Sequence, residues 1–267
     1  MGRRAYPSDI TDSEGKIIQP LLSKNKARGR KRDTDLREVV NAIFYLLEEG
    51  CQWRALPHDF PHWSTVRTYF DKWNRNKIWY RINQQLREQL RQQQGRKRQP
   101  SAAAIDSQSV KTTDKKGEVY GYDGGKKLKG RKRHILVDTM GLLLEVIVTE
   151  ANGSERINGL ALLLESQENL NRLELIWVDQ GYEGSRFKQG VANLTSATVE
   201  VMKRNGKGFQ LLARRWVVER TFAWLLKKRR LVVDYEKLPE TSESLIYVAM
   251  VHLMLKRLTK DESLLST

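Results

Sequence analysis

Apolar residues recur at helical spacing through the first ninety residues of the chain. In the stretch TDLREVVNAIFYLLEEG they lie three or four positions apart, which predicts an amphipathic helix that Thr34 can cap and Gly50 can end. Similar stripes predict a helix that opens at Ser64 and another that covers roughly 76–94. These segments together predict a small all-α region at the start of the chain.

A shorter helix should precede the longer ones. Thr11, followed three residues later by Glu14, forms a capping-box pattern, and Pro20 should kink or end the helix. Gly15 lies inside this helix, where glycine costs about 1 kcal/mol relative to alanine. The first helix therefore has a weak interior position.

The helix from Ser64 directs Arg67 and Lys72 outward, which suits a helix-turn-helix-like reader of the DNA major groove. The connection to the preceding helix is longer than the usual turn of such motifs, so a plain helical bundle is the alternative. The polar tract that follows, from Gln92 to Pro100, has the composition of a linker.

Beyond residue 100 the pattern changes to short runs rich in β-branched residues. Two such runs on either side of DTMG predict an antiparallel hairpin. Strands interspersed with helices indicate an α/β fold, with a mixed sheet and flanking helices. The expected elements are a strand at 104–110, a loop at 119–130, the hairpin, a helix over NGLALLLESQENL, a strand over LELIWVD, a strand near 198–204, and helices around 214–229 and 242–258.

The charge balance adds an expected partner to this picture. The chain has 48 Lys and Arg against 32 Asp and Glu, a net charge of +16, and its basic residues gather in RGRKR, GRKR and KKLKGRKRH. Such a surface favours a polyanion because each neutralised phosphate releases counterions. Nucleic acid is the first candidate and a membrane surface the second, although no basic amphipathic helix with an aromatic face supports a membrane.

Other features limit the class of protein. No long uninterrupted apolar run predicts a spanning helix, and the N-terminal stretch MGRRAYPSDI lacks the apolar segment of a secretory signal. Cys51 is the single cysteine, so neither an internal disulfide nor a multi-cysteine zinc site is expected. We therefore expect a protein of the reducing cytoplasm.

Three carboxylates stand where a core would not place them. Asp106 lies within the first expected strand, Asp179 ends the strand LELIWVD, and Glu219 lies in an apolar and basic helix. An unpaired buried carboxylate is costly, whereas a cluster of carboxylates can hold hard cations through oxygen. Two such cations can activate a water or a 3′-hydroxyl and stabilise the leaving oxygen of a phosphodiester. For Glu219 the alternative is a surface ion pair with Arg215.

Long motifs at these positions resemble a known family. IDSQSVKT, GYDGGKKLKGRKRHILVDTMGLLL, WVDQGY and RRWVVERTFAWLLKKRRLVVDYEKLPETSESLIYVAM are similar to the bacterial insertion-sequence DDE transposases of the IS-Five type. YPSDITDSEGKIIQPLL and LREVVNAIFYLLEEGCQWRALPHDFPHWSTVRTYFDKW resemble the region that precedes the catalytic domain in that family. The resemblance covers nearly the whole chain, with the motifs in the family's order.

The resemblance implies a ribonuclease H-like catalytic domain whose catalytic and metal-binding acids are Asp106, Asp179 and Glu219. It implies cleavage and strand transfer of DNA with Mg²⁺, for which Mn²⁺ can substitute, and Arg215 as a phosphate or transition-state contact. The organisation we expect is an N-terminal helical DNA-binding domain at 1–91, a basic linker at 92–101 and the catalytic domain at 102–260. The candidate DNA contacts are Arg67, Lys72, Lys126, Lys127, Lys129, Arg131, Lys132, Arg133, Arg215, Arg220 and Lys227.

The expected partners are double-stranded DNA, as the terminal inverted repeats of the element and the target, and a second copy of the chain when two ends are synapsed. The expected location is the bacterial cytoplasm, on the nucleoid. Two alternatives stay open: an inactive or domesticated copy that regulates its element as a sequence-specific DNA-binding protein, and an RNA-binding structural protein. The second alternative gives no reason for the three acids.

Overall fold

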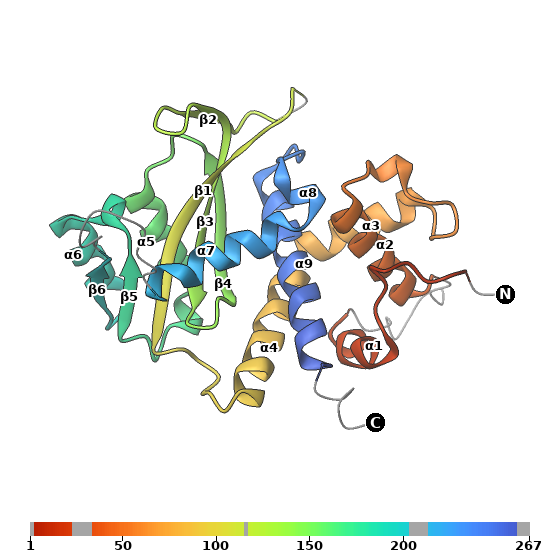
Figure 1. The fold of residues 1–267 in the computed structure, drawn as a ribbon, viewed down its shortest axis with the longest axis horizontal. Coiled ribbons are helices and arrows are strands. Elements are labelled where there is room, and N and C mark those ends of the chain that lie inside the picture. Colours follow the sequence, from red (N-terminus) through yellow and green to blue (C-terminus); the bar gives the residue numbers. More distant parts are fainter. Residues whose placement is uncertain (1–2, 23–33, 115–116, 203–212, 261–267) are drawn as a thin grey trace.

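The computed structural model describes residues 3–22, 34–114, 117–202 and 213–260, and these residues form a layer of helices beside a mixed sheet (Figure 1). The chain enters through the helical layer, builds the sheet and returns to the helical layer at its end. The fold therefore places the first and last helices side by side.

The N-terminal helices agree closely with the hydrophobic pattern. They are α1 (Asp12–Ile18), α2 (Leu36–Glu49), α3 (Trp63–Arg75) and α4 (Ile78–Gln93), with short 3₁₀ turns η1 (Gln19–Leu21) and η2 (Trp53–Ala55). The capping box of Thr11 and Glu14 is present. Gly50 ends α2 in the left-handed conformation at φ 69°. Two boundaries differ from expectation, because Asp35 rather than Thr34 caps α2 and α3 begins one residue before Ser64.

The sheet comprises β1 (Ala102–Lys111), β2 (Gly121–Asp123), β3 (Leu128–Asp138), β4 (Leu143–Glu150), β5 (Leu175–Val178) and β6 (Thr198–Val201). β3 pairs antiparallel with β1, β2 and β4, whereas β5 is parallel to β1 and β6 is parallel to β5. The main order is therefore β4-β3-β1-β5-β6, with β2 added at one end of β3. Three antiparallel strands followed by two strands parallel to the first define a ribonuclease H-like sheet, which confirms the expected fold class.

Helices cover both faces of this sheet. One face carries α5 (Glu155–Glu165) and α6 (Ser185–Leu194), with turns η3 (Gln167–Asn169) and η4 (Gln180–Tyr182) beside them. The other face carries α7 (Ala213–Leu226), α8 (Arg229–Val232) and α9 (Pro239–Leu258). Three details differ from the sequence prediction: β2 forms inside the expected loop, α6 was not expected, and the helix expected at 214–229 is divided into α7 and α8.

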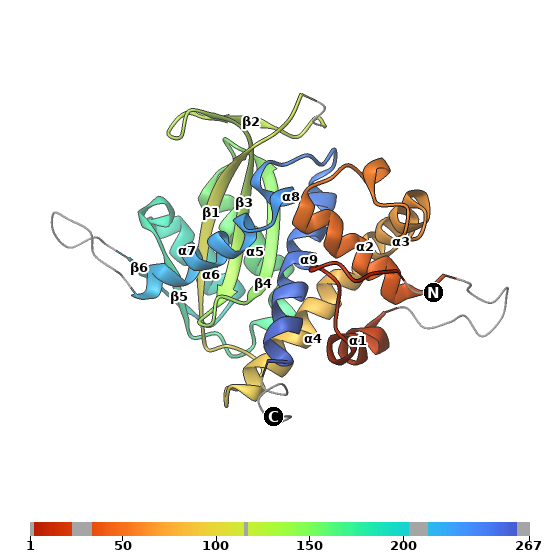
Figure 2. The ribbon, with the colours of Figure 1, turned by 45° about the vertical axis from the view of Figure 1, so that its right-hand side comes forward.

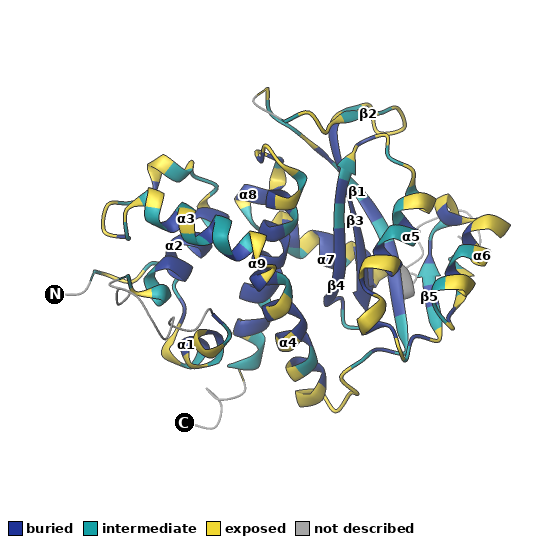
Figure 3. Ribbon diagram, turned by 180° about the vertical axis from the view of Figure 1, so that it is seen from behind, coloured by how far each residue is buried: buried dark blue, intermediate teal, exposed yellow. Residues whose placement is uncertain are grey.

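The helical layer and one face of the sheet share a continuous apolar core. The helix α9 packs against α4, α1, α2 and β4, and Figures 1 and 2 both show it beside α4 at the centre of the molecule. Most of α9 is buried (Figure 3). The division into domains at 92–101 stays a prediction. The helix α9, which follows that boundary, packs against α1, α2 and α4, which precede it, and so completes their core.

Polar contacts also join the helical layer to the sheet. The buried Arg91 guanidinium lies 2.6 Å from the carboxylate of Asp138, which is fully buried. The same carboxylate accepts backbone hydrogen bonds from Met140 and Leu142 and so fixes the turn between β3 and β4. Within the described residues, no helix is both long and apolar enough to cross a bilayer.

Candidate active site

The strand register brings Asp106 and Asp179 to neighbouring positions. The last parallel pair between β1 and β5 joins Ala104 to Trp177, and each aspartate follows its strand's member of that pair by two residues. Side chains alternate between faces along a strand, so both carboxylates belong to the face of Ala104 and Trp177, which contacts the core beneath α7 and α9. Adjacent strands lie about 4.8 Å apart. The two acids therefore meet at one edge of the sheet.

Local backbone contacts orient both carboxylates. Asp179 directly follows β5 and caps η4, where its Oδ1 accepts a hydrogen bond of 2.9 Å from the Gly181 amide. Oδ1 of Asp106 accepts a hydrogen bond of 2.7 Å from the following amide, that of Ser107. Each acid is thus held by the chain that immediately follows it.

A third carboxylate lies behind this edge, at the start of α5. Glu155 Oε1 accepts a hydrogen bond of 2.9 Å from the Ser107 hydroxyl and lies 3.6 Å from Lys132 Nζ. Its Oε2 lies so close to Gly181 that a side chain at that position would collide with it and come within 3.1 Å of Asp179 Oδ1. Glu155 therefore contacts residues adjacent to both aspartates, a role that the sequence did not reveal.

The pKa of the buried Tyr182 hydroxyl is affected by these acids. Burial raises the pKa of Tyr182 well above its usual value, and the negative charges of Asp106, Glu155 and Asp179 raise it further. Only 1% of this side chain is exposed. The phenol consequently stays protonated at any physiological pH, and its ring packs beside Phe187 in the core on the α5 side of the sheet.

Glu219 lies on α7, which packs over the same face of the sheet as Ala104 and Trp177, and its side chain is exposed. Val218 and Phe222 form the buried stripe by which α7 packs over the sheet, and Glu219 is exposed beside that stripe. In the part of the chain that the structure describes, no three Asp, Glu, His or Cys side chains form a group that could hold a metal ion. Asp106 and Asp179 thus follow neighbouring parallel strands, and Glu219 lies on the helix that packs over the same face; a shared three-acid site stays a prediction.

The basic residues of β3 are buried, which corrects the expectation that they contact DNA. Arg131 and Arg133 have no exposed surface, and they lie on the face of β3 that is covered by the chain from Leu231 onward. Arg131 pairs with Asp234 at 3.3 Å. Its remaining donors bond at 2.8–2.9 Å to the backbone carbonyls of Val119, Glu236 and Lys237.

Arg133 is buried as completely as Arg131 but has fewer partners. It donates a hydrogen bond of 2.7 Å to the Leu231 carbonyl, its Nε and second Nη have no hydrogen-bond partner, and burial lowers its pKa to about 10. Lys132, on the opposite face, is 8% exposed and lies 3.6 Å from Glu155. These three side chains are not available to a phosphate backbone, because this part of β3 is covered on both faces.

The other candidate DNA contacts differ in how accessible they are. Lys126, Lys127 and Lys129 are exposed on the β2–β3 hairpin. Arg67 is half-buried and paired with Asp71 at 2.8 Å, while Lys72 is half-buried. The remaining three are Arg220, which donates to the Met140 carbonyl, Lys227, which is exposed, and Arg215, whose side chain lies outside the described residues.

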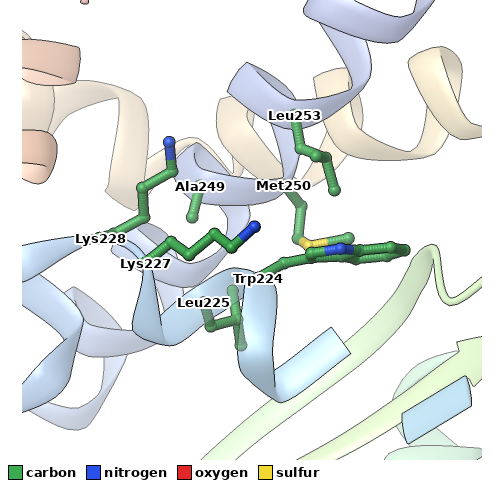
Figure 4. Close-up of a pocket in the computed structure, with 7 residues that line it drawn as sticks. All are labelled: Trp224, Leu225, Lys227, Lys228, Ala249, Met250 and Leu253. Atoms are coloured by element: carbon green, nitrogen blue, oxygen red, sulfur yellow. The ribbon is translucent and has the colours of Figure 1, made fainter. Parts of the chain in front are cut away.

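Lys227 also borders a cavity of about 170 Å³ between the end of α7, the two residues that follow it, and α9 (Figure 4). Its walls are Trp224, Leu225, Lys227, Lys228, Ala249, Met250 and Leu253. Lys228 is committed to the fold, because its ammonium bonds to Glu48 and lies 3.5 Å from His252. None of the three predicted acids lines this cavity, so it is separate from the acidic edge of the sheet.

The ribonuclease H-like sheet with two aspartates at neighbouring strand positions defines a class of nucleic-acid-processing domains. Residues 97–254 match the family model described as "Transposase DDE domain", and residues 10–83 match the one described as "Putative transposase of IS4/5 family". The first match spans more than half of the chain. The chain therefore belongs to the family of DDE-domain transposases, and its first part is similar to putative transposases of the IS4/5 family.

Among characterised sequences, the chain is similar to the "Putative transposase for insertion sequence element IS402" of Burkholderia cepacia, with 32% identity over 116 residues. The similar segment covers 40% of this chain and 54% of that protein, so the chain matches about half the length of this relative.

Two solved structures show weaker likeness. The crystal structure of the Mos1 mariner paired end complex with Mn is 12% identical, covering 89% of this chain and 80% of that chain, with a TM-score of 0.31. The simian T-cell lymphotropic virus intasome is 18% identical, covering 47% of this chain and 38% of that chain, with a TM-score of 0.32. The fold assignment rests on the strand order and the family match.

Proposed function

We propose that this chain is a DNA transposase that binds the terminal inverted repeats of an insertion sequence, cuts the DNA there and joins it to a target. The observation that supports this most directly is the register of β1 and β5, in which Asp106 and Asp179 each follow the last paired residue by two positions. A family of transposases and a strongly basic chain of net charge +16 agree with DNA as the substrate.

The donor set at this edge suits a hard divalent cation, Mg²⁺ or Mn²⁺, because carboxylate oxygens are its preferred ligands. Asp106 and Asp179 would hold it, and Glu219 would complete the set from α7. Such ions activate the attacking oxygen and stabilise the leaving oxygen of a phosphodiester. The protein's own contribution is to fix the two aspartates through the Ser107 and Gly181 amides.

The assay for this proposal is cleavage of a DNA fragment that carries the inverted repeat flanking the gene, with and without Mg²⁺. We expect cleavage and strand transfer by the wild-type chain and their loss in Asp106→Asn, Asp179→Asn and Glu219→Gln. Glu168→Gln, at an exposed position of the turn η3, is the matched control and should remain active. Full activity of Asp106→Asn or Asp179→Asn would show that the acids are assigned wrongly.

The finer points of the proposal concern assembly and location. Joining two ends requires both to be held at once, so a dimer or larger homo-oligomer is expected on DNA, and a DNA-bound protein of this kind would reside on the bacterial nucleoid. Size-exclusion chromatography with light scattering, with and without the inverted repeat, tests this. A single chain on each pair of ends would contradict it.

A second candidate function is that of a regulator, a copy that binds its element's ends without cutting them, because the net charge of +16 supports DNA binding whether or not cleavage follows. It predicts salt-sensitive binding to the inverted repeat, no cleavage at any Mg²⁺ or Mn²⁺ concentration, and no change in binding on Asp106→Asn.

A further inference from the structure

The hairpin of β2 and β3, residues 119–130, presents tyrosines among lysines. It projects from one end of the sheet (Figure 1). Tyr122 is 57% exposed and Tyr120 is 39% exposed. The ammonium of Lys129 lies 5.2 Å from the centre of the Tyr120 ring, and Lys126 and Lys127 are exposed at the turn. Large aromatic side chains left in water at a basic position indicate a surface that binds a partner.

The hairpin is built as a fixed platform. Asp123 accepts hydrogen bonds from the Ser109 hydroxyl at 2.5 Å and from the Lys126 amide at 3.0 Å, and the first of these is the main cause that lowers its pKa. At the base of the hairpin, Gly130 lies directly against the Val110 carbonyl, where a side chain would collide. Both contacts join the hairpin that carries the tyrosines to β1, the strand that contains Asp106.

The register relates this platform to the acidic edge. Asp106 is opposite Ile135 on β3, and Tyr122 is opposite Lys129 on the same strand. Lys129 precedes Ile135 by six positions. Paired residues share a face and side chains alternate, so Tyr122 is on the face of Asp106. Six residues of strand span about 20 Å. At 3.4 Å for each base pair, that is a distance of about six base pairs of DNA.

A third exposed tyrosine lies on a segment that adjoins the hairpin. The Arg131 guanidinium bonds to the carbonyl of Val119 in the hairpin and to the carbonyl of Lys237, so these two segments lie side by side. Tyr235 is 44% exposed on that second segment, and Lys237 is exposed next to it. Exposed aromatic and basic side chains are thus present on both of these adjoining segments, which together form the surface considered below.

We propose that this surface, with Tyr122 at its centre, binds unpaired bases of the element end by stacking, and so holds the DNA open about six base pairs from the cleavage point. Proteins that bind unpaired DNA combine a basic track for the backbone with aromatic rings for the bases. A fully paired duplex offers its phosphates to Lys126, Lys127 and Lys129 but no free base face to the tyrosines. The inference rests on the proposed DNA transposase function and specifies which DNA structure the enzyme selects.

The test compares two DNA probes of the same sequence, one fully paired and one with a short central run of unpaired thymines. Binding is measured by fluorescence anisotropy with the full chain and with Tyr122→Ala, Tyr122→Phe and Lys126→Ala. We expect Tyr122→Ala to lose about tenfold in affinity for the unpaired probe, which corresponds to about 1.4 kcal/mol and to the stacking of one base. Its affinity for the paired probe should be unchanged. Because Tyr122 is largely exposed, the melting temperature should also be unchanged.

The controls separate stacking from charge. Tyr122→Phe keeps the ring and should bind the unpaired probe like the wild type. Lys126→Ala should weaken both probes equally, because a lysine contacts only the backbone. The proposal is overturned if Tyr122→Ala binds the unpaired probe like the wild type, if it weakens both probes equally, or if single-stranded RNA competes better than the unpaired DNA. If the wild-type chain binds neither probe, the proposed transposase function fails instead.

Discussion

The burial of Arg131 leads to a prediction that separates folding from DNA binding. The substitution Arg131→Met removes a guanidinium that makes one ion pair and three bonds to carbonyls, and it leaves Asp234 as a buried charge without that partner. Breaking a buried ion pair on one side costs about 3–5 kcal/mol. For a chain of this size, each kcal/mol lowers the melting temperature by about 2–4 °C, so a fall of about 6–20 °C is expected.

The comparison is Lys129→Met on the same strand, where the lysine is exposed. We expect an unchanged melting temperature and a salt dependence of DNA binding that is lower by about one unit of slope, as for the loss of one phosphate contact. Differential scanning fluorimetry and anisotropy titrations at several salt concentrations measure the two quantities. If Arg131→Met does not fold, Arg131→Lys, which keeps the charge but loses the fork of donors, replaces it.

The reasoning is refuted if Arg131→Met melts like the wild type while its salt slope falls. That result would place Arg131 on the DNA surface, as the local sequence suggests, and not in the core.

Two further predictions concern stability. Gly15→Ala should raise the melting temperature by about 2–4 °C, because alanine gains about 1 kcal/mol of helix propensity over glycine. The added methyl group would lie 3.8 Å from the Arg37 guanidinium, which is an ordinary contact. A lower melting temperature would contradict this prediction. Burial raises the pKa of Glu145 and of Glu243 from 4.5 to about 7. Between these two pH values the folded state holds protons that the unfolded state has already lost, so stability should fall as the pH rises from about 4.5 to about 7. Glu145→Gln and Glu243→Gln should flatten this fall in melts recorded across that pH range, and an unchanged pH profile in both variants would refute it.

Local patterns were sufficient for most elements of the fold. The capping box at Thr11, the stop at Gly50 and the hairpin around DTMG each depend on residues a few positions apart, and each is present. Asp106 and Asp179 were singled out because a carboxylate at a strand position is unusual. Their adjacency follows from a register that only the folded sheet reveals.

The failures come from partners that are distant in sequence. The run KGRKRH has the composition of an exposed basic loop, yet Arg131 and Arg133 bond to carbonyls about a hundred residues further along the chain. Glu155 is likewise ordinary in sequence, and its contacts with Ser107 and Gly181 depend on where α5 begins above the sheet. No local signal distinguishes a basic side chain that will be covered from one that will not.

The position of α9 has a consequence for how the protein is made. Residues 239–258 fill the space between α4 and the sheet and contact α1 and α2, which the ribosome releases much earlier. During translation, the apolar surface of the N-terminal helices therefore stays exposed until α9 has been synthesised. A premature stop codon before residue 239 would for this reason yield an aggregation-prone polypeptide and not a truncated but functional DNA-binding fragment.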